Sequence, residues 1–233
     1  MRGRVALVTG GGRGIGREAA LLLSKAGAQV MVTARSAAEL ATLGLDYVAA
    51  DLGTPEGCAL AVAETERRLG PVDLLVCNHG IGSAHEQLVW EQDPAVWRET
   101  MRINLDGPFE LARLTVGGMC ERGFGRLVFT SSTAGQIAER RGSAYTASKH
   151  GLIGLARAIA QDAGLRNIAF LEADLATFAE TEEGRRLPQA DFVSMHGVWS
   201  WVSQTVRDGI LRLLRDKVRA GGVVHVSYNS LPG

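Results

Sequence analysis

Short apolar runs alternate with amphipathic stretches along most of the chain. The runs that predict buried strands are residues 4–9, 29–33, 47–51, 72–77, 126–130, 168–172 and 223–226. The stretches that predict helices are residues 16–26, 37–43, 55–69, 145–163 and 204–217, and a long stretch from 94 to about 121 that is interrupted near 107 and 108. Continuous apolar strands separated by such helices indicate a mainly parallel sheet with helices on both faces. The pattern therefore predicts an α/β, doubly wound fold with seven strands. No repeat, linker or low-complexity run divides it, so we expect a single domain over residues 1–233.

Composition and charge exclude several classes of protein. The 25 basic and 25 acidic residues give no net charge, so nothing favours a polyanion, and we do not expect nucleic acid as a partner. The cysteines, Cys58, Cys77 and Cys120, are odd in number and far apart, which suits neither a disulfide framework nor a metal site. We interpret them as reduced, buried thiols of a cytoplasmic protein. The sequence contains no run of about 18 apolar residues, so neither a membrane span nor an export signal is predicted.

A glycine-rich segment joins the first predicted strand to the first predicted helix. It reads Thr-Gly-Gly-Gly-Arg-Gly-Ile-Gly from Thr9 to Gly16. Unpaired backbone amides and the positive end of a helix attract a pyrophosphate at such a place. A side chain at Gly10 or Gly14 would obstruct the turn or hold the phosphate away, and one at Gly16 would push the helix off the strand. The segment therefore predicts a dinucleotide site, with a loop that merely turns the chain as the alternative.

The end of the second predicted strand favours NADPH. In a dinucleotide fold, the residue at this position binds the adenosine ribose of the cofactor. An acid there favours a free 2′-hydroxyl, and an arginine favours a 2′-phosphate. The strand ends in Thr-Ala-Arg-Ser, with Arg35 and no carboxylate, and Arg13 projects from the glycine loop. Guanidinium groups match phosphate geometry, so this pair predicts NADPH (NADP+) over NADH. Two solvated surface arginines are the alternative.

Candidate catalytic residues follow the fifth predicted strand. Tyr145 and Lys149 have the i, i+4 spacing at the start of a helix, which puts them on one face. The positive charge of the lysine favours the phenolate, which suits a group that donates and accepts a proton. Ser132 follows the strand at the carboxyl edge, where open α/β sheets bind ligands.

Together with Asn104 and the turn Asn78-His79-Gly80, these motifs resemble the classical short-chain dehydrogenase/reductase family, in particular ketoreductases similar to 3-oxoacyl-ACP reductase. The resemblance runs from residue 4 to about 177 and resumes weakly at 222–226. It implies a Rossmann-type sheet in which Tyr145 is the general acid or base and Ser132 holds the substrate oxygen. It also implies that Lys149 binds the nicotinamide ribose and that Asn104 positions a proton-relay water.

The resemblance further implies a set of cofactor contacts and an assembly. The cofactor residues are Gly10, Arg13, Gly14, Ile15, Gly16, Arg35, Asp51, Leu52, Asn78, Gly80, Tyr145, Lys149, Leu175 and Thr177. Asp51 is expected to bind the adenine amino group, with the backbone after it as an equal candidate and a turn aspartate as the alternative. The two long helices are expected to pair with those of a second subunit in a homodimer or homotetramer.

Three parts of the chain depart from the family pattern. Cys77 and His79 alter the usual Asn-Asn-Ala-Gly, and we interpret His79 as bound to local backbone, with the cofactor or a water as the alternative. Glu172 and Ala173 replace the usual Pro-Gly, which bears on the nicotinamide contacts. Residues 176–203 correspond to a substrate-covering segment, a mobile lid that decides specificity, although its tryptophans suit a subunit interface nearly as well.

The sequence thus predicts an NADPH-dependent enzyme that reduces a ketone, a small carbonyl compound, to a secondary alcohol, in a biosynthetic pathway that handles 3-oxoacyl or polyketide-like compounds. An alcohol dehydrogenase that works in the oxidative direction is the alternative, because the same groups serve both directions. A dinucleotide-binding protein without catalysis is a second alternative. The presence of Asn104, Ser132, Tyr145 and Lys149 together argues against it.

Overall fold

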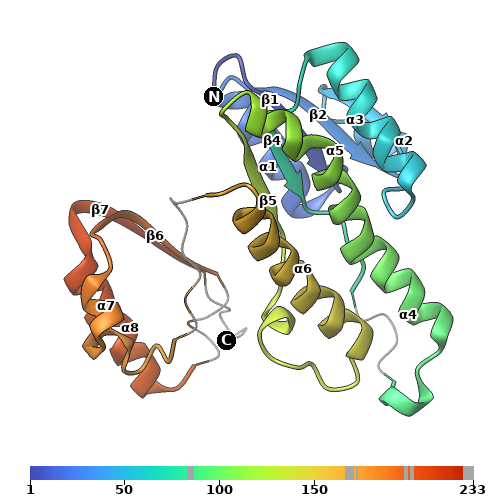
Figure 1. Cartoon of the computed structure of the whole chain (residues 1–233). Helices are drawn as coiled ribbons and strands as arrows, with labels where there is room; N and C mark the ends of the chain where they lie inside the picture. Colours follow the sequence, from blue (N-terminus) through green and yellow to red (C-terminus); the bar gives the residue numbers. More distant parts are fainter. Residues whose placement is uncertain (83–86, 166–170, 172, 197–198, 200–201, 228–233) are drawn as a thin grey trace. The chain divides into compact units, whose positions relative to one another are not determined.

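The computed structural model describes residues 1–82, 87–165, 171, 173–196, 199 and 202–227. The chain forms two compact units, Met1–Ile168 and Ala169–Gly233 (Figure 1). The single domain expected over residues 1–233 stays a prediction.

The first unit is built on five parallel strands. They are β1 (Val5–Thr9), β2 (Gln29–Ala34), β3 (Asp46–Ala49), β4 (Leu74–Cys77) and β5 (Arg126–Phe129), in the order β3-β2-β1-β4-β5. The first five predicted strands are therefore confirmed, with small shifts at their ends. Strand β1 pairs with β2 on one side and β4 on the other, so the winding direction changes at β1. A crevice forms at the carboxyl ends of the strands at such a point, which is where open α/β sheets bind ligands.

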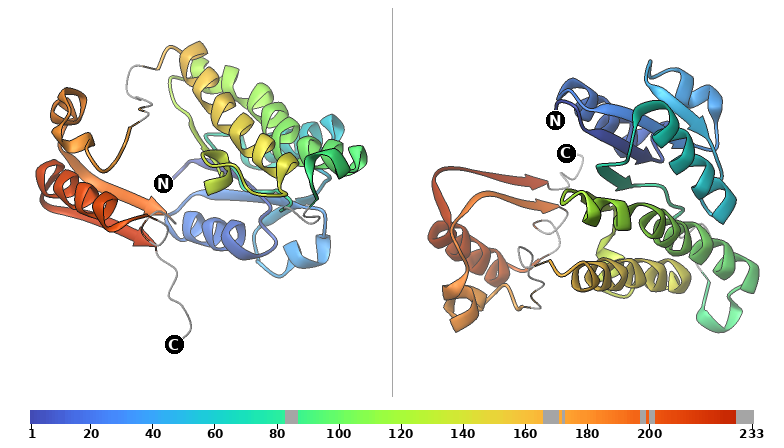
Figure 2. Two further views of the ribbon diagram at one scale, coloured as in Figure 1. Left: turned by 90° about the horizontal axis from the view of Figure 1, so that it is seen from below. Right: turned by 45° about the horizontal axis from the view of Figure 1, so that its top comes forward.

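Helices cover both faces of this sheet. They are α1 (Gly14–Lys25), α2 (Ala37–Ala41), α3 (Pro55–Leu69), α4 (Pro94–Met101), α5 (Gly107–Glu121) and α6 (Ser143–Asp162). Figure 2 shows α1 on one side of the sheet and α5 and α6 on the other. Helix α3 illustrates the local causes: the Thr54 hydroxyl accepts a hydrogen bond from the amide of Gly57, Pro55 occupies the first turn, and Gly70 ends the helix at φ 104°.

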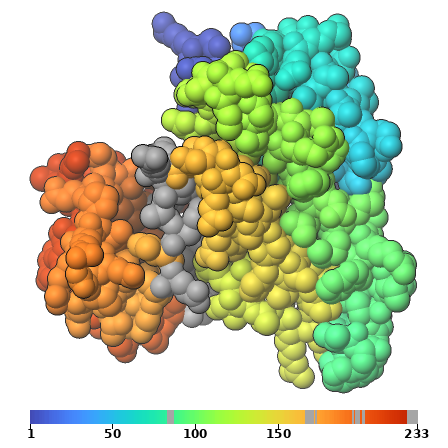
Figure 3. Space-filling model, viewed as in Figure 1, coloured from blue at the N-terminus to red at the C-terminus, as the bar shows by residue number. Residues whose placement is uncertain are grey.

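The predicted interruption of the long helix is a π-helical turn, η2 (Arg102–Asp106), between α4 and α5. Pro108 cannot donate a backbone hydrogen bond, and Gly107 lies so close to Leu52 that a Cβ there would overlap its carbonyl oxygen. The turn therefore lets the helix pack against the segment that follows β3. Residues of α4 and α5, in green, form a continuous surface of the first unit in Figure 3.

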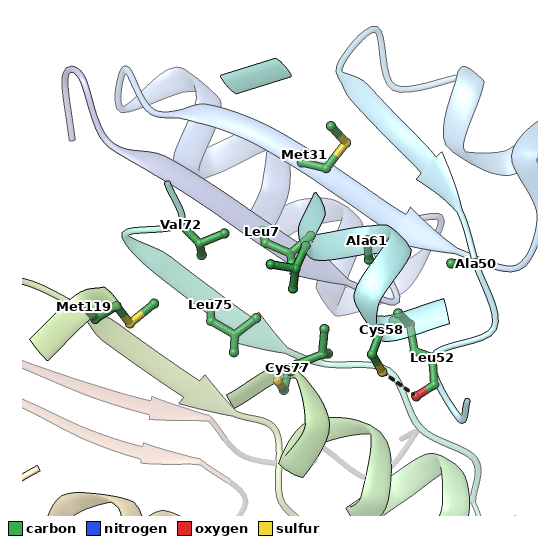
Figure 4. Packing of buried hydrophobic residues seen from close by; sticks show 12 residues of the cluster. Leu7, Met31, Ala50, Leu52, Cys58, Ala61, Val72, Leu75, Cys77 and Met119 are labelled. Atoms are coloured by element: carbon green, nitrogen blue, oxygen red, sulfur yellow. Dashed lines mark hydrogen bonds between the residues drawn. The ribbon is translucent and has the colours of Figure 1, made fainter. Parts of the chain in front are cut away.

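Alternate residues of β1 supply the two halves of the core. Leu7 packs with Met31, Leu75 and Leu111 in a cluster that includes residues of α3 and α5 (Figure 4). Ala6 and Val8 belong to a second cluster that includes residues of α1 and α2. This alternation is the period of two that a strand imposes, and each fully buried leucine stabilises the fold by about 1.5–3 kcal/mol.

The second unit contains three elements that were not predicted: η4 (Phe178–Glu180), α7 (Glu182–Arg186) and β6 (Ala190–His196). The helix predicted over residues 204–217 is confirmed as α8 (Gln204–Lys217), and β7 (Val218–Ser227) follows it. Strands β6 and β7 form a separate two-stranded parallel sheet, so the described residues do not show the seven predicted strands in one sheet. The predicted last strand lies within β7, whereas most of the predicted strand at 168–172 falls outside the described residues.

No helix or strand is predicted within residues 176–203, and this prediction is wrong for β6. The segment holds no continuous apolar run, and its strand is defined by pairing with β7, which local composition does not reveal. None of the helices described is long and apolar enough to cross a membrane.

Candidate active site and cofactor cleft

A cleft of about 510 Å³ lies at the carboxyl ends of the central strands of the first unit. The predicted cofactor residues that line it are Gly10, Arg13, Arg35, Asp51, Leu52, Asn78 and Gly80. They come from four separate stretches of sequence, at the ends of β1, β2, β3 and β4. The cleft therefore occupies the position that the winding of the sheet provides for a ligand.

The glycine loop is shaped for close approach of a ligand. Gly10 and Gly14 have φ values of 62° and 55°, which side chains other than glycine rarely adopt. A Cβ at Gly10 would lie 2.9 Å from the Cα of His79, and one at Gly16 would overlap the carbonyl oxygen of Gly10. Gly14, Ile15 and Gly16 form the first turn of α1, whose amides have no partner within the helix. This cradle fits a pyrophosphate.

Two arginines and one acid occupy the β2 side of the cleft. Arg13 and Arg35 are exposed, and neither pairs with an acid among the described residues. The sequence at the end of β2 contains no carboxylate, yet Glu39 also lines the cleft, from the first turn of α2. The helix that follows the strand brings this acid back to the loop, which the strand sequence alone did not indicate.

Asp51 is held at the far end of the cleft by two donors. Its Oδ1 accepts from the Gly53 amide at 3.0 Å, and its Oδ2 accepts from Arg102 Nη1 at 3.0 Å. Partial burial raises the pKa of Asp51, but the Gly53 amide and the Arg102 guanidinium outweigh burial, so the pKa is lowered. Arg102 also binds Glu99 through Nε and Nη2, at 2.8 and 2.7 Å. Arg102 was not predicted as a site residue, because nothing local in the sequence links it to Asp51.

His79 lies at the winding change between β1 and β4. Its Nδ1 is 2.7 Å from the Thr9 hydroxyl, which also accepts hydrogen bonds from the amides of Asn78 and His79 at 2.9 and 3.2 Å. The interpretation of a histidine bound to local backbone is therefore wrong for Nδ1. Burial, together with the positive charge of Lys149, lowers the pKa of His79 to about 4, so the ring is neutral near neutral pH.

Tyr145 and Lys149 lie together on α6, as their spacing predicts. The Nζ of Lys149 is 5.6 Å from the centroid of the Tyr145 ring and donates to the Thr130 carbonyl at 2.9 Å. Lys149 is only 5% exposed, and this burial lowers its pKa. A Cβ at Gly80 would lie 3.1 Å from Asn104 Oδ1 and 3.7 Å from Lys149 Nζ. The structure thus brings Gly80, Asn104 and Lys149 together.

The buried side chain of Asn104 is tied to the chain segment after β4. Its Oδ1 accepts from the Ile81 amide at 2.8 Å, and its Nδ2 donates to the Ile81 carbonyl at 2.9 Å and to the Ser148 hydroxyl at 3.2 Å. Asn104 therefore joins the π-turn, α6 and the wall of the cleft, and its role toward a water stays a prediction.

Ser132 occupies the turn that follows β5. Its hydroxyl accepts from the Ala134 amide at 3.2 Å and caps the short helix η3 (Thr133–Gly135). A Cβ at Gly135 would lie 3.0 Å from the Lys149 carbonyl, so this turn packs closely on α6. No described residue accepts the Ser132 proton, which leaves the hydroxyl able to donate to a ligand.

A second pocket of about 310 Å³ includes Tyr145 in its wall. Ile81, Ala95, Val96 and Ala144 give it apolar walls, and Gln92, Glu99, Thr100 and Arg141 supply polar groups. Ile81 also lines the first cleft, so the two spaces adjoin. Arg141 has φ 60°, the one positive value outside glycine among the described residues. An apolar pocket with a few polar groups beside a cofactor cleft is typical of a substrate site.

The remaining predictions concern Leu175, Thr177, Glu172 and the three cysteines. Leu175 and Thr177 belong to the second unit, and their cofactor contacts stay predictions. Glu172 lies outside the described residues. The expectation of three buried thiols is confirmed for Cys58 and Cys77 and is wrong for Cys120, which is exposed on α5. Burial raises the pKa of Cys58 to about 12, so this thiol is inert as a nucleophile.

Comparison with known proteins gives consistent similarities. A family profile described as short chain dehydrogenase matches residues 4–189. The chain is 35% identical over 191 residues to an acetoacetyl-CoA reductase of Rhizobium meliloti (strain 1021), which covers 80% of this chain and 78% of the relative. It is 31% identical over 206 residues to a 3-oxoacyl-acyl-carrier-protein reductase of Pseudomonas aeruginosa, with 84% and 82% covered.

A crystal structure of a variant of actinorhodin polyketide ketoreductase with NADPH has a TM-score of 0.66 at 30% identity, covering 83% of this chain and 70% of that one. The residues matched by the family profile include every residue that lines the two pockets.

Proposed function

Because the chain belongs to the short-chain dehydrogenase/reductase family, we propose that it is an NADPH-dependent oxidoreductase that reduces a ketone to a secondary alcohol. One observation carries the proposal. Tyr145 lines a largely apolar pocket that adjoins the cofactor cleft, and the buried ammonium of Lys149 lies 5.6 Å from its ring. A proton donor, a fixed positive charge and space for a substrate thus meet beside the cleft.

The choice of NADPH rests on the β2 side of the cleft. Arg13 and Arg35 offer two guanidinium groups that form no ion pair among the described residues, and a 2′-phosphate would supply one. A ketoreductase of similar fold was solved with NADPH, which supports the same choice. At the other end, Asp51 and the backbone of Leu52 would hold the adenine.

The residues of the first unit divide the chemistry of reduction between them. NADPH, when bound in the cleft, supplies the hydride for the carbonyl carbon. Tyr145 donates its phenolic proton to the carbonyl oxygen, and Ser132 donates a hydrogen bond to that oxygen while the proton moves. The ammonium of Lys149 stabilises the phenolate that remains and binds the nicotinamide ribose. A positioned acid of this kind contributes roughly 10²–10⁴ in rate.

Reduction is the proposed direction because the curated relatives described above are named as reductases. Their names also favour a 3-oxoacyl compound as the substrate, and we propose this class for the pocket beside Tyr145. The catalytic groups serve oxidation equally well, so an alcohol dehydrogenase uses the same site in reverse. A homodimer or homotetramer and a cytoplasmic location stay predictions.

Replacement of Tyr145 by phenylalanine tests the proposal. Tyr145→Phe keeps the ring and removes the proton donor, so NADPH consumption with acetoacetyl-CoA should fall by about 10²-fold or more. NADPH affinity, measured by fluorescence titration, should stay within about twofold, since one hydroxyl is lost and the ribose contact of Lys149 remains. Tyr47→Phe, which changes a tyrosine of β3 outside both pockets, is the matched control. Retention of more than about a tenth of the activity by Tyr145→Phe would show that another group carries the proton.

A further inference from the structure

The side chain of Glu39 lies over the phosphate loop. A Cβ at Gly12 would be 2.8 Å from Glu39 Oε2 and 3.1 Å from Glu39 Cβ. Glu39 lines the same cleft as Arg13, Arg35 and Ser36, and its side chain is exposed. A carboxylate thus stands among the groups that surround the 2′-position of the adenosine ribose in the proposed cofactor site.

Glu39 does not act as the helix cap that its sequence position suggests. The order Ser36-x-x-Glu39 matches a capping box, in which the serine binds the glutamate amide and the carboxylate returns to the serine amide. The first half is present, because Ser36 Oγ accepts from the Glu39 amide at 3.3 Å. The second half is not among the hydrogen bonds of the described residues, and the carboxylate lies against Gly12 instead.

The Glu39 carboxylate also forms no ion pair within the part of the chain that the structure describes. Other glutamates of this unit pair with an arginine one turn away, as Glu99 does with Arg102 and Glu110 with Arg113. No described residue forms an ion pair with Glu39, although Arg13 and Arg35 line the same cleft. The Glu39 carboxylate therefore offers a hydrogen-bond acceptor to a 2′-hydroxyl of a bound ribose, and the same charge repels a 2′-phosphate.

We propose that Glu39 is a specificity-determining residue that reduces the preference for NADPH and allows NADH to bind. This inference rests on the proposal that the cleft binds a nicotinamide dinucleotide. An ionised carboxylate accepts hydrogen bonds only, so it suits a 2′-hydroxyl. Against a 2′-phosphate it is a like charge, which opposes the attraction of Arg13 and Arg35. The chain then discriminates less between the two cofactors than its arginines alone would allow.

Glu39→Gln tests this assignment by binding rather than by turnover. The dissociation constants of NADPH and NADH are measured by fluorescence titration for wild type and variant at low salt. We expect the NADPH constant to fall about fivefold and the NADH constant to rise about twofold, a tenfold change in their ratio, or about 1.4 kcal/mol. The increase in NADPH affinity caused by Glu39→Gln should be smaller at high salt, because the interacting charges are exposed.

Two further variants make the result specific. Glu56→Gln removes an exposed charge from the first turn of α3, outside the cleft, and should change neither constant. Glu39→Ala removes the charge and the acceptor together and should also tighten NADPH. A role of Glu39 in stabilising α2 or the loop would instead weaken both cofactors alike, and that result would overturn the inference.

The outcomes separate this inference from the function on which it rests. If wild type binds NADPH and Arg35→Asp weakens that binding, but Glu39→Gln leaves both constants within about twofold, the cofactor site stands and the role of Glu39 is refuted. If wild type binds neither cofactor, the proposed function fails and the inference fails with it.

Discussion

Arg102 donates to Asp51 at 3.0 Å and at the same time holds both carboxylate oxygens of Glu99. Asp51 lines the cofactor cleft, whereas Glu99 lines the pocket beside Tyr145. One guanidinium therefore fixes an acid in each of the two spaces. Arg102 also begins the π-turn that carries Asn104, so its position bears on three parts of the proposed site.

Arg102→Gln should weaken the binding of NADPH about three- to tenfold. Asp51 loses the donor that aligns its carboxylate with the adenine, and one charge-assisted hydrogen bond is worth roughly 1.5–3 kcal/mol before solvent replaces it. The pKa of Asp51 should rise, because Arg102 is one of the groups that lower it. NADPH affinity of the variant should therefore decline at a higher pH than in wild type when the solution is acidified. Calorimetric titration at several pH values measures both effects.

Arg113→Gln is the matched control for Arg102. Arg113 binds both carboxylate oxygens of Glu110 at the same i, i+3 spacing on α5, and neither residue lines the cofactor cleft or the pocket beside Tyr145. Exposed pairs of this kind contribute about 0–1 kcal/mol to stability. If both variants weaken NADPH equally, the effect belongs to general stability, and the adenine role of Asp51 and Arg102 is wrong.

His79→Gln should change how the stability of the protein depends on pH. Burial holds the pKa of His79 at about 4 in the folded state, whereas an exposed histidine has about 6.5. Between these values the unfolded chain binds a proton that the folded chain does not, so wild-type stability falls as pH falls from about 6.5 to about 4. The loss attributable to His79 is on the order of 3 kcal/mol over that interval. In His79→Gln, the free energy of unfolding should lack this part of the dependence on pH.

Urea unfolding at pH 7 and pH 5 measures the change in slope. The variant also loses the bond to Thr9, which lowers stability at both pH values and leaves the slope unaffected. His150→Gln is the control, because His150 is exposed on α6. Equal slopes for wild type and His79→Gln would show that His79 is not held neutral by burial.

The fold of the first unit follows largely from local signals. Helix α3 begins and ends where the sequence predicts, because Thr54, Pro55 and Gly70 mark its ends. The glycine loop was found because its conformation requires residues without side chains. Strand β6 was missed, since its pairing with β7 depends on residues far away in sequence.

The candidate site was predictable where one element carries the signal. Tyr145 and Lys149 share a helix, so their spacing alone predicted their proximity. Arg102 and Glu39 were missed, because each acts across elements: Arg102 reaches Asp51 from the π-helical turn between α4 and α5, and Glu39 returns to the glycine loop from α2. Such pairings arise from packing, which no local pattern records.

Lys149→Met should lower NADPH affinity and turnover together, in contrast to Tyr145→Phe, which should lower turnover alone. Methionine keeps the length and packing of the side chain and removes the charge that is proposed to bind the ribose and to stabilise the phenolate. We expect NADPH affinity to fall about tenfold and turnover on acetoacetyl-CoA about 10²-fold or more, measured by titration and by NADPH consumption.

The pH dependence of stability gives a second test of Lys149. Burial lowers the pKa of Lys149, so between this lowered value and the ordinary value near 10.5 the unfolded chain binds a proton that the folded chain has lost. Wild-type stability should gain from this group as pH rises through that window, and the Met variant should not show the gain. Lys25→Met, which changes a lysine at the end of α1 outside both pockets, should leave affinity and turnover unchanged. If Lys149→Met binds NADPH as wild type does, the ribose role is wrong, whatever happens to turnover.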